Sequence, residues 1–270
     1  DTFNIASPKQ TCNVSFWSKN ETWILGTLSV SIFLLFWQYS VTFGLVNPLF
    51  TSSPIKIVQT AITMFSQGDI YTDIKVSSIE FFWGYSLSIL IGVPMGILMG
   101  WYNRVNAVCE PFVSALYASP RIALVPLMVI WFGIGLGSKI AIIFLGAVFP
   151  ILINMVTGVR TVDRDFIKVA RAFGATDRQL FVTVVFPSTV PMLLAGLRLG
   201  LGHALIGIVV GEMYAATAGI GYMISVAGST FRTSQVMVGV IIIAGLGVVL
   251  TEALRAIERR FERWRPDNRR

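Results

Sequence analysis

Six apolar stretches, most of them long enough to cross a lipid bilayer, are the feature that most limits what this chain can fold into. The hydrocarbon core of a bilayer is about 30 Å thick, so a spanning α-helix needs about 20 mostly apolar residues. Of the 270 residues, 54% are hydrophobic and only 13% are charged, whereas about 25% are charged in an ordinary soluble domain. The composition excludes a soluble enzyme, a disordered chain and a disulfide scaffold. It predicts an all-α integral membrane protein with about six transmembrane helices.

The expected spans follow one another along the chain, separated by polar or Pro-containing connections. They are Trp23–Phe43, Val76–Trp101, Ile122–Gly135, Lys139–Gly158, Val190–Met213 and Val236–Leu254. The third span is short and is interrupted by Pro126. Short helices are expected at Pro54–Phe65 and Ala107–Ala118, and Pro187 is expected to end the helix that precedes the fifth span. Glycines four residues apart in the second and fifth spans indicate faces where a neighbouring helix approaches closely.

The distribution of Lys and Arg predicts how the chain lies in the membrane. The formal net charge is +7, from 21 Lys and Arg against 14 Asp and Glu. With a cytoplasmic N-terminus, sixteen Lys and Arg, including Arg121, fall on the inner side; four fall on the outer side, namely Lys56, Lys75, Lys139 and Arg232. The positive-inside rule then predicts that both termini are cytoplasmic. No soluble basic domain accompanies the Arg-rich tail, so nucleic-acid binding is not expected.

The polar segment 160–186, between the fourth and fifth spans, is patterned like two short helices joined by a glycine. Asp163 or Asp165 is placed to cap the first helix. Gly174 stands where a helix ends in a left-handed residue. The spacing of Thr176–Gln179 is that of a capping box that starts a second helix. We therefore predict a helix–glycine–helix elbow on the inner face of the membrane.

One face of the first elbow helix is apolar. Its apolar residues recur at the helical spacing i, i+3, i+4 and i+7, and they are Phe166, Val169, Ala170 and Phe173. The opposite face is basic. Two interpretations stay open: the apolar stripe packs on its own bundle, or it docks into a groove on a cytoplasmic partner.

The same segment carries a sequence motif. The stretch Lys168–Gly174, nine further residues and then Val184–Pro187 resemble the EAA loop of ABC importer permeases. That family's pattern is Glu-Ala-Ala, three residues, Gly, nine residues and Ile-x-Leu-Pro. Three positions are in register: Ala170, Gly174 and Pro187. Three positions depart from the pattern: Lys168 stands for Glu, Val169 for Ala and Phe186 for Leu. A salt bridge from the family's Glu to the ATPase subunit therefore cannot be assumed for Lys168.

Further stretches narrow the resemblance to the permeases of the sulfonate, taurine, nitrate and bicarbonate group. These stretches are Pro120–Leu127, Trp131–Gly135, Ala195–Leu199 and Gly211–Met213. The resemblance covers about residues 75–255 and implies a type I ABC importer transmembrane domain. It divides the chain into a cytoplasmic segment 1–22, a first transmembrane helix with an external segment 23–74, a permease core 75–254 with a coupling loop 160–186, and a basic cytoplasmic tail 255–270.

The resemblance also implies partners and a place of action. The implied partners are a second permease copy, two cytoplasmic ATP-binding subunits that hold ATP and Mg, and an external substrate-binding protein that is periplasmic or lipid-anchored. The implied location is the lipid bilayer of a bacterial inner membrane. This chain would hold no cofactor itself. Its coupling residues would be Phe166, Ala170 and Phe173 as groove contacts, Gly174 as the bend, and Lys168, Arg171 and Arg178 as a polar rim. The cargo would be a small, anionic solute; the alternative is a neutral heterocycle or vitamin precursor.

Three ionisable residues stand within the fifth span, where an uncompensated charge costs several kcal/mol. Arg198 either lines the translocation path and attracts an anion, or ties the helix to loop carbonyls or to a neighbouring acid. Glu212 lies about 21 Å farther along the same helix; it either faces the outer end of the path or marks the outer interface. His203 is expected to hydrogen-bond within the bundle rather than relay protons.

Two other classes of function remain as alternatives. A membrane-embedded enzyme needs a nucleophile–base pair or a metal cluster, and the sequence shows neither, so the chain is expected not to be an enzyme. A secondary transporter needs coupled acids in its spans, where Arg198, His203 and Glu212 are the candidates. Transport without an ATPase partner would revive that alternative.

Overall fold

Helices account for all the regular structure in the residues that this computed structural model describes, 16–47 and 50–261. In chain order they are α1 (Phe16–Thr42), α2 (Pro54–Gln67), α3 (Asp69–Trp101), α4 (Asn103–Ala118), α5 (Val125–Phe132), α6 (Leu136–Arg160), α7 (Arg164–Ala172), α8 (Asp177–Leu180), α9 (Phe186–Ala215), α10 (Ile220–Ser229) and α11 (Thr233–Phe261). Five of these stretches are long and apolar enough to cross a membrane, and there are six if the bent pair α4–α5 counts as one. The predicted fold class is confirmed.

The core of the bundle lies along α6, which packs between α3 and α9. The glycine spacing explains how the three helices approach so closely. A Cβ added at Gly96 of α3 would lie 2.6 Å from the Met155 Cβ of α6, and one at Gly200 of α9 would lie 2.8 Å from the Ile151 Cγ1. Neither position has room for a side chain. The glycine strips predicted from the sequence therefore do face a neighbouring helix.

The helix boundaries correct several predicted spans. The second span begins at Asp69 rather than near Val76, since α3 follows α2 after the single residue Gly68. The third span is broken: α4 and the segment that contains α5 meet at an angle of 93°. The sixth span is longer than expected at both ends. It continues to Phe261, so the tail predicted from residue 255 begins inside a helix.

Pro187 does not end a helix, contrary to expectation. From Asp177 to Ala215 the chain is one helical run, in which a π-helical turn, Phe181–Val185, joins α8 to α9. A proline lacks the N–H for the normal bond to the residue four positions earlier, and a π turn is the local adjustment that accommodates such a gap. The second half of the elbow and the fifth span are therefore continuous.

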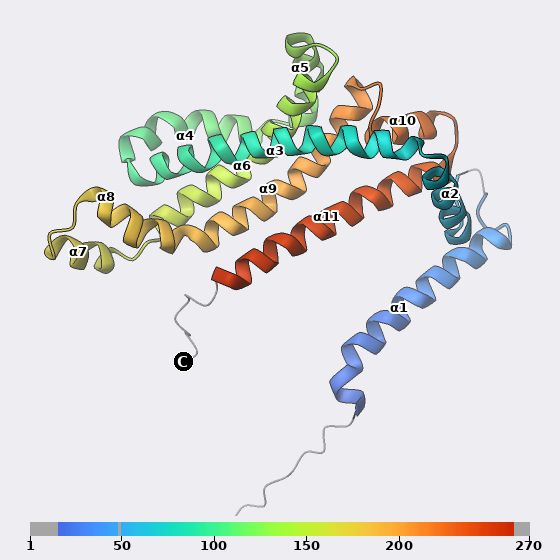
Figure 1. Cartoon of the computed structure of the whole chain (residues 1–270), viewed down its shortest axis with the longest axis horizontal. Helices are drawn as coiled ribbons and strands as arrows, with labels where there is room; N and C mark the ends of the chain where they lie inside the picture. Colours follow the sequence, from blue (N-terminus) through green and yellow to red (C-terminus); the bar gives the residue numbers. More distant parts are fainter. Residues whose placement is uncertain (1–15, 48–49, 262–270) are drawn as a thin grey trace, which may run out of the picture.

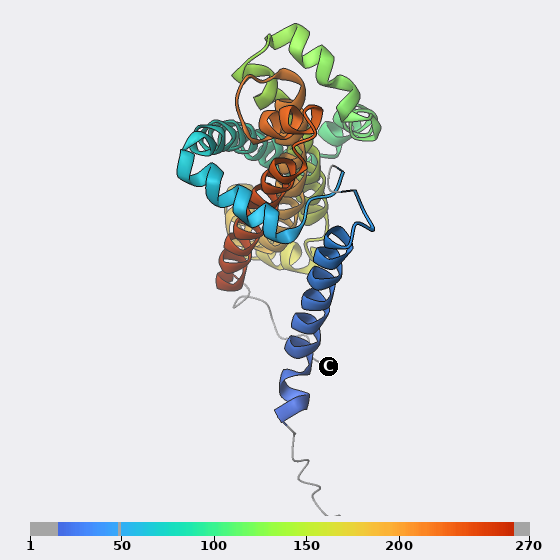
Figure 2. The same ribbon diagram turned by 90° about the vertical axis from the view of Figure 1, so that its right-hand side faces the viewer.

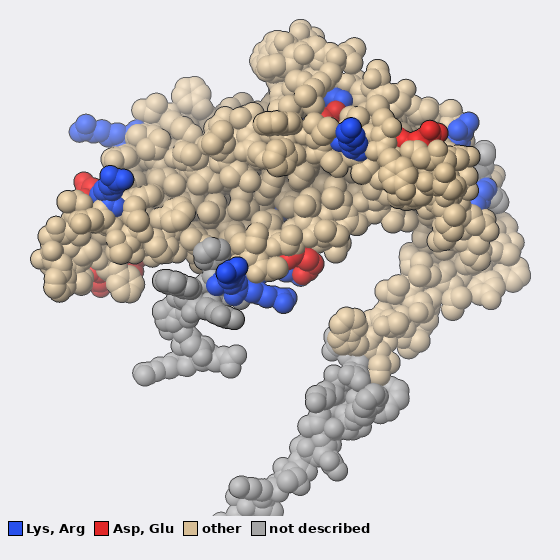
Figure 3. All heavy atoms as spheres, in the orientation of Figure 1, with Lys and Arg blue, Asp and Glu red and all other residues tan. Residues whose placement is uncertain are grey.

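Two helices stand at the margin of the bundle. In Figures 1 and 2, α1 leaves the bundle beside α2 and points away from it, and α11 runs along α9. The apolar side chains of α1, such as Trp23, Leu35 and Phe36, are exposed. Figure 3, in the orientation of Figure 1, shows only scattered charged side chains on the face of the bundle turned toward the viewer. A surface of this kind suits a lipid environment.

Candidate functional site

The predicted elbow, residues 164–180, is present and carries the predicted caps. Asp163 precedes α7, and its Oδ1 accepts a hydrogen bond from the Asp165 N–H at 2.9 Å. Gly174 has φ +76°, so it is the left-handed residue that ends the first helix. Thr176 and Gln179 form the reciprocal capping box that begins α8. The local sequence signals therefore build the two helices as predicted.

The apolar stripe of the elbow is not packed on the bundle. Phe166, Val169 and Phe173 are 62%, 54% and 88% exposed, and Ala170 is half-buried. The elbow is nevertheless anchored, because Leu180 is 1% exposed and other apolar elbow residues pack against the ends of α6 and α9. The elbow is thus a fixed projection with one apolar face open. Of the two interpretations that the sequence left open, the one in which the apolar stripe packs on the chain's own transmembrane helices is therefore wrong.

The polar rim of the elbow is also exposed. The Lys168 Nζ lies 2.8 Å from the Asp165 Oδ1, and the Arg171 guanidinium lies 3.8 Å from the Asp177 Oδ1. Exposed pairs such as these contribute about 0–1 kcal/mol, so they do not fix the basic side chains in place. Arg178 is exposed as well. These charges are available to a partner surface.

A buried polar network occupies the other end of the bundle, where α10 begins. The first N–H groups of a helix have no intrahelical partner, and here side chains from other helices accept them. Gly219 donates to the Asp73 Oδ1 at 2.8 Å, Ile220 to the Ser77 Oγ at 2.9 Å and Gly221 to the Glu212 Oε2 at 2.6 Å. The Ser77 hydroxyl in turn donates to the Glu212 Oε1. We call this set the α10 network; it ties α10 to α3 and α9.

Next to the α10 network lies a buried ion pair. Lys139 of α6 pairs with Glu80 of α3, and the two residues are 5% and 1% exposed. Lys139, which the Lys and Arg count places on the outer side, therefore has its charge neutralised inside the bundle. Sequence reasoning missed Glu80, although a glutamate inside the apolar stretch Val76–Trp101 was the signal that would have found it.

The two residues predicted to line a path have protein partners. Arg198 pairs with Glu258 of α11, which is the neighbouring-acid alternative. Glu212 is fully buried in the α10 network. Whether either residue contacts a solute is not tested by these contacts and stays a prediction. The imidazole of His203 has no hydrogen-bond partner in the described part of the chain, contrary to expectation.

Comparison with known proteins identifies similar chains. The model of the family described as "binding-protein-dependent transport system inner membrane component" matches residues 89–263. A putative aliphatic sulfonates transport permease protein of Bacillus subtilis (strain 168) is 33% identical over 247 residues, which cover 92% of this chain and 90% of that protein. A taurine transport system permease protein of Escherichia coli (strain K12) is 33% identical over 252 residues, which cover 92% and 91%.

A solved structure has the same fold. It is a crystal structure of an amino acid ABC transporter with histidines, which superposes with a TM-score of 0.56. The alignment covers 76% of this chain and 98% of that chain at 16% sequence identity. At this identity the likeness concerns the fold alone.

Proposed function

The chain belongs to the family of binding-protein-dependent transport system inner membrane components, and from this premise we propose that it moves a small organic anion across the membrane when a separate subunit hydrolyses ATP. The observation that carries the proposal is the open apolar face of the elbow. Phe173 is 88% exposed directly after α7, in an elbow that is anchored through the buried Leu180 of α8. An exposed apolar helix face of this kind fits a groove on another protein.

The elbow would be the contact with the ATPase subunit. Phe166, Ala170 and Phe173 would enter its groove, and Gly174 would allow the bend. Lys168, Arg171 and Arg178 would form the rim; positive charges at a rim set the orientation of binding more than its strength. Lys168 stands where the family pattern has Glu, so its contribution to the rim would be a positive charge in place of a negative one.

The proposal fixes an orientation and a set of partners. The ATPase subunits lie in the cytoplasm, so the elbow and both chain ends face the cytoplasm, as the Lys and Arg distribution also favours. Two copies of the chain would face each other around the path, over two ATPase subunits. A substrate-binding protein would deliver cargo at the α10 end. ATP-driven approach of the two elbows would then rock the bundles between inward-open and outward-open forms.

The cargo would be of the sulfonate class. The named functions of the two relatives are transport of aliphatic sulfonates and of taurine, and each of these solutes carries a sulfonate group. ATP and Mg would bind to the partner subunit and not to this chain.

Purification and uptake with two matched variants test the proposal. Phe173→Asp places a charge on the open face, and Ala172→Ser alters the neighbouring residue outside the apolar stripe. In proteoliposomes holding the assembled transporter, with the binding protein supplied, Phe173→Asp should lower ATP-dependent taurine uptake at least about tenfold and release the ATPase subunit during purification. Ala172→Ser should do neither. Full uptake by Phe173→Asp, or uptake without ATP, would contradict the proposal.

A further inference from the structure

A cavity opens where the third span is broken. The backbone between α4 and α5 leaves the helical path at Ser119 and Pro120 and makes a 3₁₀ turn over Arg121–Leu124. Beside it lies a cavity of about 290 Å³, walled by this segment, α6 and α9. Irregular backbone at membrane depth is tolerated where it is buried in protein or lines a cavity. Breaks of this kind are also where membrane transporters place ligand sites.

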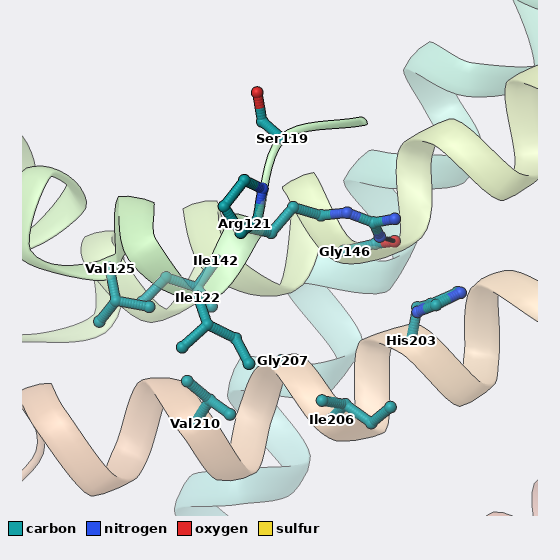
Figure 4. Close-up of a pocket in the computed structure, with 11 residues that line it drawn as sticks. Ser119, Arg121, Ile122, Val125, Ile142, Gly146, His203, Ile206, Gly207 and Val210 are labelled. Carbon is teal, nitrogen blue, oxygen red and sulfur yellow. Dashed lines mark hydrogen bonds between the residues drawn. The ribbon is translucent and has the colours of Figure 1, made fainter. Parts of the chain in front are cut away.

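Two basic side chains project into one end of the cavity. The Arg121 guanidinium donates from Nη1 to the Gly146 carbonyl oxygen at 2.8 Å and lies 5.3 Å from the centre of the Tyr117 ring. His203 rises from α9 on the same side, as Figure 4 shows. The Arg121 guanidinium stays protonated in proteins, and in the described part of the chain no carboxylate pairs with Arg121 or His203. This end of the cavity therefore carries positive charge without a counter-ion from the protein.

Much of the guanidinium remains available. An Arg side chain has five N–H donors in a planar fork, and the bond to Gly146 uses one of them. An imidazole donates at least one N–H in either charge state. The two groups together offer several donors to one small oxyanion, and a hydrogen bond between a charged donor and an anion is stronger than one between neutral groups.

The rest of the cavity is apolar. Its walls include Ile122, Val125, Ile142, Ile206 and Val210. Figure 4 places Ile122, Val125 and Val210 toward the end opposite the two basic side chains. An inorganic anion would leave these walls uncovered. A ligand that has an anionic head and a short aliphatic chain would use both ends.

We propose that this cavity binds a short-chain aliphatic sulfonate during its passage, with the sulfonate oxygens between Arg121 and His203 and the chain against Ile206 and Val210. The inference rests on the proposed function, because it assigns that function's cargo to a site in this chain. Affinity should rise about fourfold for each methylene added to the chain until the apolar end is filled, since each buried methylene contributes a constant increment of affinity. Nitrate and bicarbonate should compete weakly.

Site-directed labelling tests the cavity without relying on transport. In a background of Cys12→Ser and Cys109→Ala, Ile206→Cys places one thiol in the cavity wall. In the assembled transporter, a sulfonate-bearing thiol reagent should label it several-fold faster than a cationic reagent of the same size, and butanesulfonate should protect it better than methanesulfonate. Adding Arg121→Gln should abolish both differences. Equal rates, or protection by a neutral pyrimidine and not by butanesulfonate, would overturn the proposal.

Uptake by the assembled transporter separates this proposal from the proposed function. Arg121→Gln and His203→Gln should each raise the half-saturating concentration of butanesulfonate about tenfold. Arg104→Gln, an exposed arginine in the first turn of α4 and away from the cavity lining, is the matched control and should behave as the unaltered chain does. If sulfonate uptake is intact in both cavity variants, the cavity proposal fails and the proposed function stands. If the cavity is protected by butanesulfonate but no ATP-driven uptake occurs, the proposed function fails and the cavity proposal stands.

Discussion

The two ends of the bundle both depart from the usual distribution of side chains: one end buries polar groups, and the other exposes apolar groups. At the α10 end, charged and polar side chains are buried, and the carboxylate of Glu212 accepts hydrogen bonds from two other elements. At the elbow end, large apolar side chains such as Phe173 are exposed. A buried network that satisfies its own polar groups holds helices to one another, whereas an exposed apolar face is complete only with a partner. The α10 end therefore holds the helices to one another, and the elbow end is the proposed docking surface.

Removing a single charge at the α10 end should have the largest effect on stability. Lys139→Met leaves the Glu80 carboxylate buried without its partner, which is expected to cost about 3–5 kcal/mol of unfolding free energy. The measurement is thermal unfolding of the detergent-solubilised chain. The double variant Lys139→Met/Glu80→Leu removes both charges and should recover most of the loss. A single variant as stable as the unaltered chain would show that the ion pair does not hold α3 to α6.

Substitutions at two glycines with positive φ, one at each end, compare the two ends directly. Gly219 (φ +124°) lies against the Glu212 carboxylate, whereas Gly174 (φ +76°) has open space around it. Gly174→Ala should cost about 1–2 kcal/mol, because only the backbone is strained. Gly219→Ala should cost about 1–3 kcal/mol more, because the added methyl also displaces Glu212. Unfolding temperatures of the two variants test the order, and equal losses would mean that the α10 network tolerates the displacement.

A loss smaller than that of Gly219→Ala is expected when one hydrogen-bonding link of the α10 network is removed. Ser77→Ala leaves the Ile220 N–H without its acceptor and takes a donor from Glu212, and it should cost about 1.5–3 kcal/mol. Ser66→Ala is a suitable control, since that hydroxyl bonds only within its own exposed helix. Hydrogen exchange at the start of α10 should speed up in the first variant and not in the second. Unchanged exchange would mean that Ser77 does not hold α10.

The smallest effect on stability is expected at the elbow. Phe173→Ser removes a side chain that is almost entirely exposed, so the unfolding free energy of the isolated chain should change by no more than about 0.5 kcal/mol. Binding of the ATPase subunit should weaken at least about tenfold in a pull-down titration, because a large apolar anchor is lost. A strong loss of stability in the isolated chain would indicate that this face packs on the bundle after all.

How much the sequence predicted differs between these ends, and the reason is physical. The elbow is built from short-range signals, such as the Asp163 cap and the left-handed Gly174, and these were predicted correctly. The α10 network joins Asp73 and Ser77 to residues more than 130 positions later. No local pattern encodes such a pairing, and α10 itself was not predicted.

The sequence predicted the helix end at Ala118, but the sharp bend after it and the helical run through Pro187 were missed for a related reason. A proline signals that a regular hydrogen bond is absent, but the sequence does not say whether the chain then bends or adopts a π turn. Near Pro120 the chain bends by 93° and a cavity forms. At Pro187 the helix continues. The surrounding packing decides between these outcomes.

Because of the π turn before Pro187, the second helix of the elbow, α8, is continuous with α9. The unbroken helical run Asp177–Ala215 has 39 residues and is therefore about 58 Å long. His203 and Glu212 both lie on this helical run, so a displacement imposed at its α8 end would be carried along one continuous backbone to both the cavity and the α10 network.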